Sequence, residues 1–223
     1  MHKSGYPCPN TWDDVSPRQA NRASRSFKLL RKKAVPVFHG RLVVEDDDEV
    51  TIQTIEDVVR RSQVLLAVVS RADGMDQADS LALIEQLDAW PGVSPSEKVF
   101  LLDDSPSQNK CIDFYRRTES IWTLFWALNL TDRLAWPSSR CNIKKLLQTA
   151  ILIMGETPCI EQMQLRSVAE ILDAKDLHLR IHWAIRDASM RDWMLPFNLN
   201  WTGKSRRVPL TVCKGFHVVQ QRH

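Results

Sequence analysis

Residues Ser167–Met190 read SVAEILDAKDLHLRIHWAIRDASM and determine the fold class of this chain. Eight ionisable residues lie between Asp173 and Asp187, interleaved with aliphatic side chains and Trp183. At about 100° per residue, they sort into two stripes of a helix. The first stripe, about 60° wide, contains Asp173, Asp176, Arg180 and Asp187. The second, roughly opposite, contains His178, His182 and Arg186. Since apolar residues occupy both flanks, we predict a largely buried helix that carries an acidic–basic network.

Helical patterns also fill the chain before this segment. Apolar residues recur at helical spacing over Thr54–Arg71, Met75–Trp90, Ser94–Leu102, Ile112–Leu128 and Ile143–Met154. Only Val35–Val44 is rich in β-branched residues, and it predicts one or two short strands or an extended segment. We therefore expect a mainly α fold, a single multi-helix domain with at most a few short strands.

The first 50 residues differ in character from the rest. Ser16-Pro17 begins a predicted helix that reaches Lys33 and is rich in arginine and lysine, and an acidic run, EDDDE, covers Glu45–Glu49. We expect the basic stretch to be a solvated helix face rather than a nucleic-acid surface, and the acidic run to be a solvated loop. The organisation predicted is a basic N-terminal helix with an extended, acidic segment in residues 1–50, and a helical domain in residues 51–223.

Composition excludes several classes of protein. The 223 residues are 43% hydrophobic, enough for a sizeable core, and the net charge of +3 does not demand a nucleic-acid partner. The five cysteines are odd in number and form no CxxC pair, which favours reduced thiols over a disulfide framework or a zinc ribbon. The N-terminus lacks a signal-peptide core, and no apolar run is long enough to span a bilayer. We expect a cytoplasmic protein that does not contact membranes.

The charged helix is the strongest candidate site. Arginine pairs well with carboxylates through its planar fork, and Asp176 and Arg180 are one turn apart. A structural ion-pair network is the favoured interpretation, with a ligand or acid–base site as the alternative, and Glu119 or Arg222 can join from other elements. A cation site of aspartates is disfavoured by the arginine among them.

The histidines raise a second question about the same helix. His178 and His182 have the i,i+4 spacing of zinc ligands, but residue 179 is Leu, so there is no HExxH motif. A third ligand must come from His217, His223 or Cys159, and we favour structural histidines. We predict no metal and no cofactor. No GxGxxG, Walker A or GxSxG motif occurs. The aromatic residues Trp122, Phe125 and Trp126 are expected in the core.

Four fragments occur together in a fixed order: SPSEKVFLL (Ser94–Leu102), YRRTESIWTLFWALNLTDRLAWPSSRCN (Tyr115–Asn142), LDAKDLHLRIHWAIRDA (Leu172–Ala188) and VVQQRH (Val218–His223). They resemble an uncharacterised bacterial family, domain of unknown function 4272, over roughly residues 50–223. Tyr115 and Gln221 stand where that pattern has Trp and Glu, and the usual tail after the last fragment is absent. The resemblance supports the helical fold and singles out residues, but it implies no activity.

Two hypotheses of function follow. The first is a non-enzymatic cytosolic protein-binding module, in a specific form an immunity protein that neutralises a bacterial toxin; its motivation is the lack of a catalytic motif beside charged segments suited to protein contacts. The second is a hydrolase-type enzyme that uses the Asp173/Asp176/Asp187 and His178/His182 cluster, with Trp183 beside it. It requires these groups to converge in an open cleft. The oligomeric state is left open.

Overall fold

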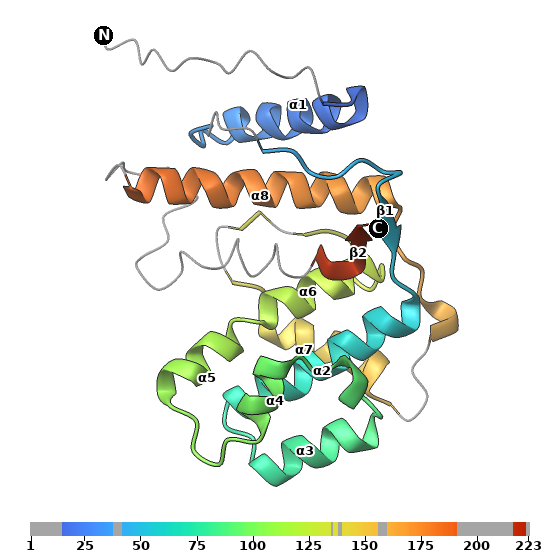
Figure 1. The fold of residues 1–223 in the computed structure, drawn as a ribbon, viewed down its shortest axis with the longest axis vertical. Coiled ribbons are helices and arrows are strands. Elements are labelled where there is room, and N and C mark those ends of the chain that lie inside the picture. Colours follow the sequence, from blue (N-terminus) through green and yellow to red (C-terminus); the bar gives the residue numbers. More distant parts are fainter. Residues whose placement is uncertain are drawn as a thin grey trace.

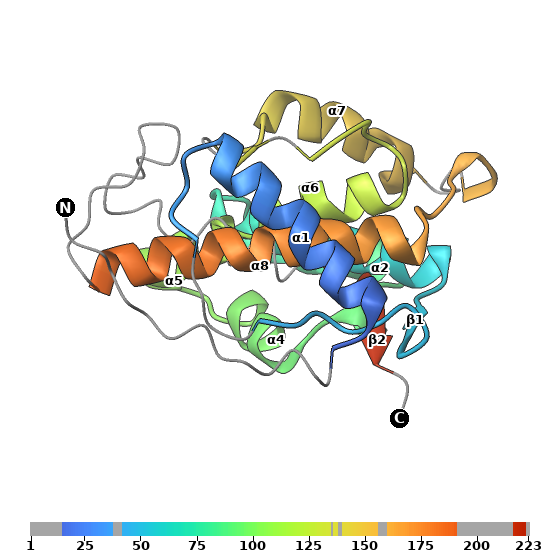
Figure 2. The ribbon, with the colours of Figure 1, turned by 90° about the horizontal axis from the view of Figure 1, so that it is seen from above.

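Helix α2 (Ile55–Ala72) runs through the centre of the molecule and is buried on most of its circumference. The computed structural model describes residues 15–37, 42–134, 136–137, 140–155, 160–190 and 216–221. Helices α3 to α7 surround α2, while α1 and α8 form a separate layer above them (Figure 1). Seen from above, α1 lies across α8, and α7 lies on the outside next to α6 (Figure 2).

The described residues form eight α-helices, three 3₁₀-helices and two strands. The remaining α-helices are α1 (Pro17–Lys32), α3 (Gln77–Gln86), α4 (Pro95–Leu101), α5 (Gln108–Tyr115), α6 (Thr118–Ala127), α7 (Ile143–Met154) and α8 (Val168–Met190). The 3₁₀-helices are η1 (Trp90–Gly92), η2 (Ile160–Gln162) and η5 (Phe216–Val218). Strands β1 (Val50–Ile52) and β2 (Val219–Gln221) pair antiparallel, with Thr51 opposite Gln220. The mainly α prediction is confirmed.

Helix boundaries follow from local side-chain chemistry. Ser16 and Ser94 each form a capping box with the residue three positions on, and Thr54 caps α2. At the other end, α1, α3 and α6 are followed by a residue with positive φ: Ala34, Asp88 and Asn129. In each case the next amide donates to the carbonyl five residues earlier, which closes the last turn. Since Asp88 adopts this conformation, α3 ends at Gln86, before the predicted end at Trp90.

Two further expectations needed correction. The segment Ile112–Leu128, predicted as one helix, is divided into α5 and α6 at Arg116 and Arg117. At this division Arg117 turns its guanidinium inward to a buried carboxylate. The two strands lie at Val50–Ile52 and Val219–Gln221, whereas the described part of Val35–Val44 is irregular.

The hydrophobic core has two parts that share α2. The larger part includes Leu65 and Leu66 of α2 with Ile171 and Ile181 of α8, and the smaller includes Val64 with Phe100 of α4. Neighbouring residues of α2 therefore face different clusters, which explains why the helix is apolar around most of its surface. The predicted core aromatics Phe125 and Trp126 are buried, and Trp122 packs against the same cluster.

Candidate functional site

The acidic stripe of α8 meets α1 through a buried arginine. Arg22, on the inner face of α1, is 3% exposed, and its Nε donates to Asp173 Oδ1 at 3.1 Å. Its two other nitrogens donate to the Glu45 carbonyl at 3.1 Å and to an Asp47 carboxylate oxygen. Arg25, which is 57% exposed, also binds Asp173. Asp173 is thus neutralised by two cations of α1.

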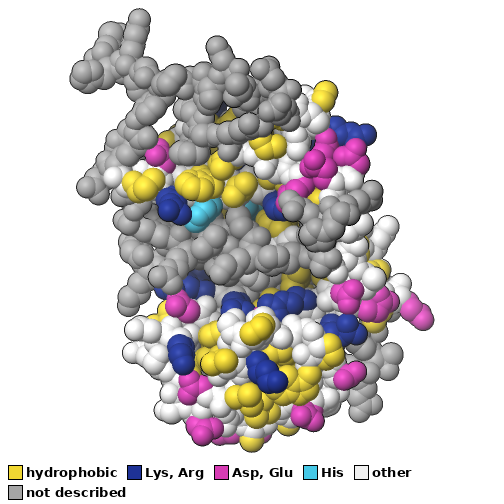
Figure 3. Space-filling view, in the orientation of Figure 1, with side chains coloured by type: hydrophobic (Ala, Val, Ile, Leu, Met, Phe, Trp, Pro, Cys, Tyr) yellow, Lys and Arg dark blue, Asp and Glu magenta, His cyan; other side chains and the backbone are white. Residues whose placement is uncertain are grey.

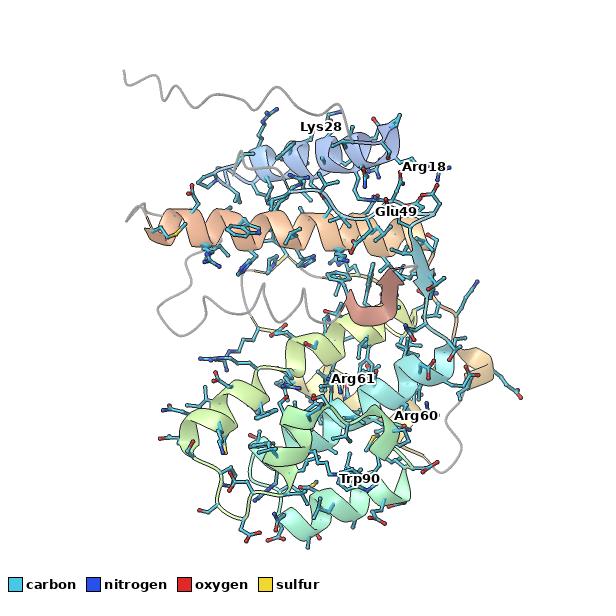
Figure 4. All side chains as sticks on the ribbon, viewed as in Figure 1. Arg18, Lys28, Glu49, Arg60, Arg61 and Trp90 are labelled. Carbon is cyan, nitrogen blue, oxygen red and sulfur yellow. The ribbon has the colours of Figure 1, made fainter. Side chains whose placement is uncertain are left out.

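The acidic run after α1 lies against the same helices. Lys175 of α8 donates to both carboxylate oxygens of Glu45, at 2.9 and 2.7 Å. Together with the bond from Arg22 to Asp47, this contact anchors the run to α8 and α1. The acidic run was predicted to be a solvated loop, but two of its carboxylates take part in this α1–α8 ion-pair network, while Glu49 lies at its outer edge (Figure 4).

The second acidic residue of the stripe is paired within α8. Arg180 donates from Nε and Nη2 to the two oxygens of Asp176, at 2.8 and 2.9 Å, and both side chains are about 2–3% exposed. The same Nη2 donates to the Leu42 carbonyl at 2.8 Å, and the guanidinium lies over the Phe27 ring, 4.4 Å from its centroid. Nη1 is buried and has no hydrogen-bond partner. Arg180 therefore joins α8 to α1 and to the segment between α1 and β1.

The two histidines lie on the inner side of α8. His178 is buried, its Nδ1 is 2.8 Å from the Ala174 carbonyl, and its ring is 5.7 Å from Phe216. Burial lowers its pKa below the ordinary value of 6.5. The pKa of His182 is also lowered, by burial and then by the charge of Arg186, and its Nδ1 is buried without a hydrogen-bond partner. Both rings are therefore neutral at neutral pH.

The remaining predicted site residues are not drawn into one place. Glu119, at the start of α6, is buried and accepts the Cys141 amide at 2.8 Å, so its hydrogen bond goes to Cys141 and not to α8. Burial raises the pKa of Glu119, and burial followed by the charge of Glu119 raises the pKa of the Cys141 thiol to about 12. Trp183 is half-buried beneath Arg186, whose guanidinium is 5.1 Å from the ring centroid. Asp187 is half-buried on α8.

Some predicted residues fall outside the part of the chain that the structure describes. These are Arg222, the candidate third ligands Cys159 and His223, and the side chain of His217. Within the described residues, no group of three or more His, Cys, Asp and Glu side chains is placed to hold a metal ion. Asp173 lines a shallow cavity of about 230 Å³ between α1 and α8, whereas Asp176, Asp187, His178 and His182 do not line it or the three larger cavities among the described residues.

A second buried charge cluster, which sequence reasoning missed, lies around Glu97 of α4. Glu97 is fully buried and binds Arg61 of α2 in a two-point ion pair, at 2.7 Å for both bonds. It also accepts Arg117 and the Ser94 amide, so all four lone-pair positions of the carboxylate are used. The capping-box pattern from Ser94 to Glu97 identified the helix start, but nothing local indicated that two distant arginines converge on it.

The geometry defines a mainly α protein in which Asp173 joins α8 to α1, while Asp176, Arg180 and His178 are buried and make polar contacts within α8. The chain belongs to the family described as domain of unknown function 4272, whose model matches residues 22–208. The matched region begins inside α1, so it includes the helix that supplies Arg22, and it ends before β2. No curated protein and no solved structure matches the chain. None of the helices among the described residues has the length and apolar character needed to cross a membrane.

Proposed function

We propose that this protein is a non-enzymatic protein-binding module whose docking surface is the outer face of α7. The observation that carries the proposal is an exposed aliphatic stripe: Leu147 is 56% exposed, Ile151 73% and Leu152 42%. Residues 147 and 151 are one turn apart, so they stand on the same side of the helix. On the opposite side, Leu146, Ala150 and Ile153 are buried in the core and hold α7 in place.

The charge around this stripe specifies the kind of partner. Residues 133–155 contain two arginines and two lysines but no Asp or Glu. Lys144 and Lys145 are exposed at the start of α7, directly beside the stripe. A complementary surface presents aliphatic side chains bordered by carboxylates, because positive and negative potentials then face each other across the contact. We assign an acidic, amphipathic helix of another protein as the occupant.

A protein partner fits this face better than a lipid surface. Helices that lie in a bilayer interface carry Trp, Phe or Leu on the apolar face and Lys and Arg spread along the polar face, so the placement of the cations is what discriminates. On α7 the exposed apolar side chains are all aliphatic, and the lysines stand together at one end. The saturated ion pairs of Asp173 and Asp176 support a scaffolding role for the charged helix rather than a hydrolytic one. In the immunity-protein form of this function, the acidic helix belongs to a toxin.

The test compares two exposed aliphatic residues on different helices. Ile151→Asp places a carboxylate in the stripe, and Val99→Asp is the matched control, because Val99 is 64% exposed on α4. The tagged wild-type protein is used to purify a partner from its native host, and affinity is then measured with that purified partner. We expect Ile151→Asp to weaken binding at least tenfold, Val99→Asp to leave it unchanged, and added salt to weaken it.

Three results would overturn the proposal. They are an equal loss of affinity in both variants, the absence of any partner that binds the purified chain, and binding of the chain to anionic vesicles instead of a protein. Sedimentation with vesicles of phosphatidylserine and phosphatidylcholine measures the last of these directly.

A further inference from the structure

A cavity of about 360 Å³ opens between α2, η1 and the strand pair. Its polar lining comes from Gln53, Asp57, Arg60 and Arg61, and its apolar lining includes Leu124 and Val218. The labelled side chains of Arg60 and Arg61 lie next to each other on α2 (Figure 4). In Figure 3, Lys and Arg side chains and apolar side chains gather over the lower helices on this face. The volume lies within the range of small-molecule sites, roughly 300–1,000 Å³.

The charges at this cavity do not balance. Glu97 neutralises one of the two arginines that bind it, and Asp57 neutralises Arg60 through a 3.1 Å ion pair. Three guanidinium groups, from Arg60, Arg61 and Arg117, therefore face two carboxylates. The neighbouring positive charge affects Arg117. Burial, followed by the charge of Arg61, lowers the pKa of Arg117 to about 10. A bound anion offsets the part of this shift that comes from Arg61, which lines the cavity, whereas Arg117 does not line it.

Donors remain to hold such an anion. Arg60 uses one Nη for Asp57, and among the described residues its Nε and other Nη have no hydrogen-bond partner; its side chain is 40% exposed. Both carboxylate oxygens of Asp57 are already engaged, one by Arg60 and the other by the Thr54 hydroxyl at 3.0 Å. An incoming anion therefore meets the unused face of Arg60 rather than a free carboxylate.

We propose that this cavity binds a small anion, a carboxylate or phosphate group carried on an apolar body, with Arg60 as the direct ligand. Arg61 lies at the inner wall and is fixed there by Glu97 and by the Gly92 carbonyl, to which its Nη1 donates at 3.0 Å. Pro91 is the exposed apolar residue of the lining and offers the surface that the body of the ligand covers, while Leu124 and Val218 form the buried floor behind it. The site uses no residue of α7, so it is independent of the docking face.

Thermal shift and calorimetric titration with two probes test this assignment. Inorganic phosphate supplies the anion alone, sodium benzoate adds an apolar ring, and sodium chloride at equal ionic strength is the reference. We expect both probes to raise the melting temperature beyond chloride, with benzoate bound more tightly than phosphate. The order of the two affinities identifies the anionic group, because a site specific for phosphate binds phosphate more tightly than benzoate.

Arg60→Gln is the decisive variant, and Lys110→Gln is its control. Lys110 is likewise exposed and paired with one aspartate, but it lies on α5 away from the cavity lining. Arg60→Gln should weaken benzoate binding at least tenfold, Arg60→Lys should restore part of it, and Lys110→Gln should leave it unchanged. The melting temperature without probe reports whether each variant is folded. Equal effects of all anions, or binding that survives Arg60→Gln in a folded variant, would overturn the proposal.

Discussion

Arg180 is held by Asp176, one turn earlier on the same helix, in a two-point ion pair that is almost completely withdrawn from water. The guanidinium extends from α8 to the Leu42 carbonyl and the Phe27 ring, so one side chain joins three segments of the chain. The importance of such a buried pair appears when one partner is removed. The remaining charge is then buried without a counter-charge, which is far more costly than a buried neutralised pair.

Replacement of Arg180 by Ala should therefore be severely destabilising. It leaves the Asp176 carboxylate buried without a counter-charge, which costs about 3–5 kcal/mol. For a chain of this length the melting temperature should fall by roughly 6–20 °C. Arg180→Lys should recover part of the loss, since an ammonium restores the charge but not the planar fork that also reaches the Leu42 carbonyl. Differential scanning calorimetry measures the shift, and a variant that melts within about a degree of wild type would contradict a structural role.

Arg22 and Arg25 offer a matched comparison, because both bind Asp173 from α1. Arg22 is buried and makes two further contacts, to the Glu45 carbonyl and to Asp47, whereas Arg25 is mostly exposed. We expect Arg22→Ala to lower the free energy of unfolding by about 1–3 kcal/mol, because Asp173 keeps Arg25 as a partner, and Arg25→Ala to lower it by about 0–1 kcal/mol. Urea denaturation of the two variants gives both values. Similar losses would mean that α1 contributes equally through its exposed and its buried faces.

The sequence predicts those interactions that are local in the chain. Asp176 and Arg180 meet because the i,i+4 spacing brings them together on any helix, and the caps at Ser16 and Ser94 follow from their own motifs. The partners of Asp173 were not predictable in this way, since Arg22 lies 151 residues away and reaches it only once α1 packs on α8. The convergence of Arg61 and Arg117 on Glu97 depends likewise on tertiary packing.

The sequence did not show which side chains find partners on other elements. Glu119 was a candidate to join the α8 stripe, and its place near the N-terminus of α6 puts its carboxylate against the Cys141 amide. Arg22 was counted with the solvated basic face of α1, although its position on the helix turns it inward while Arg18 and Lys28 point to solvent (Figure 4). Composition shows that a helix is basic, but only packing shows which of its cations is buried.

At the end of α1, a substitution is expected to stabilise the protein rather than destabilise it. Ala34 adopts φ 54°, a left-handed conformation that costs a residue with a Cβ about 1–2 kcal/mol. Ala34→Gly removes this strain at some cost in unfolded-chain entropy, so it should stabilise the protein by about 0.5–1 kcal/mol. Gly74→Ala at φ 113°, just after α2, is the reverse control and should be destabilising. Thermal melts of both variants test the pair, and a lower melting temperature for Ala34→Gly would refute the argument.

His178 should make the stability of the protein depend on pH. In the folded protein its pKa is lowered by burial, whereas in the unfolded chain it titrates near 6.5. Between those two values the unfolded state binds more protons, so the free energy of unfolding falls as the pH drops below about 6.5 and is fully present above it. His178→Leu should flatten this slope, which for one proton is at most about 1.4 kcal/mol per pH unit.

The variant is designed to keep the fold. The Ala174 carbonyl, which contacts the His178 ring, remains within helix α8, and the leucine can still pack on Phe216. Urea denaturation from about pH 5 to about pH 8 measures the effect, with His182→Leu as a control in which a less buried histidine is removed. Identical slopes for His178→Leu and wild type would show that another group governs the loss of stability in acid.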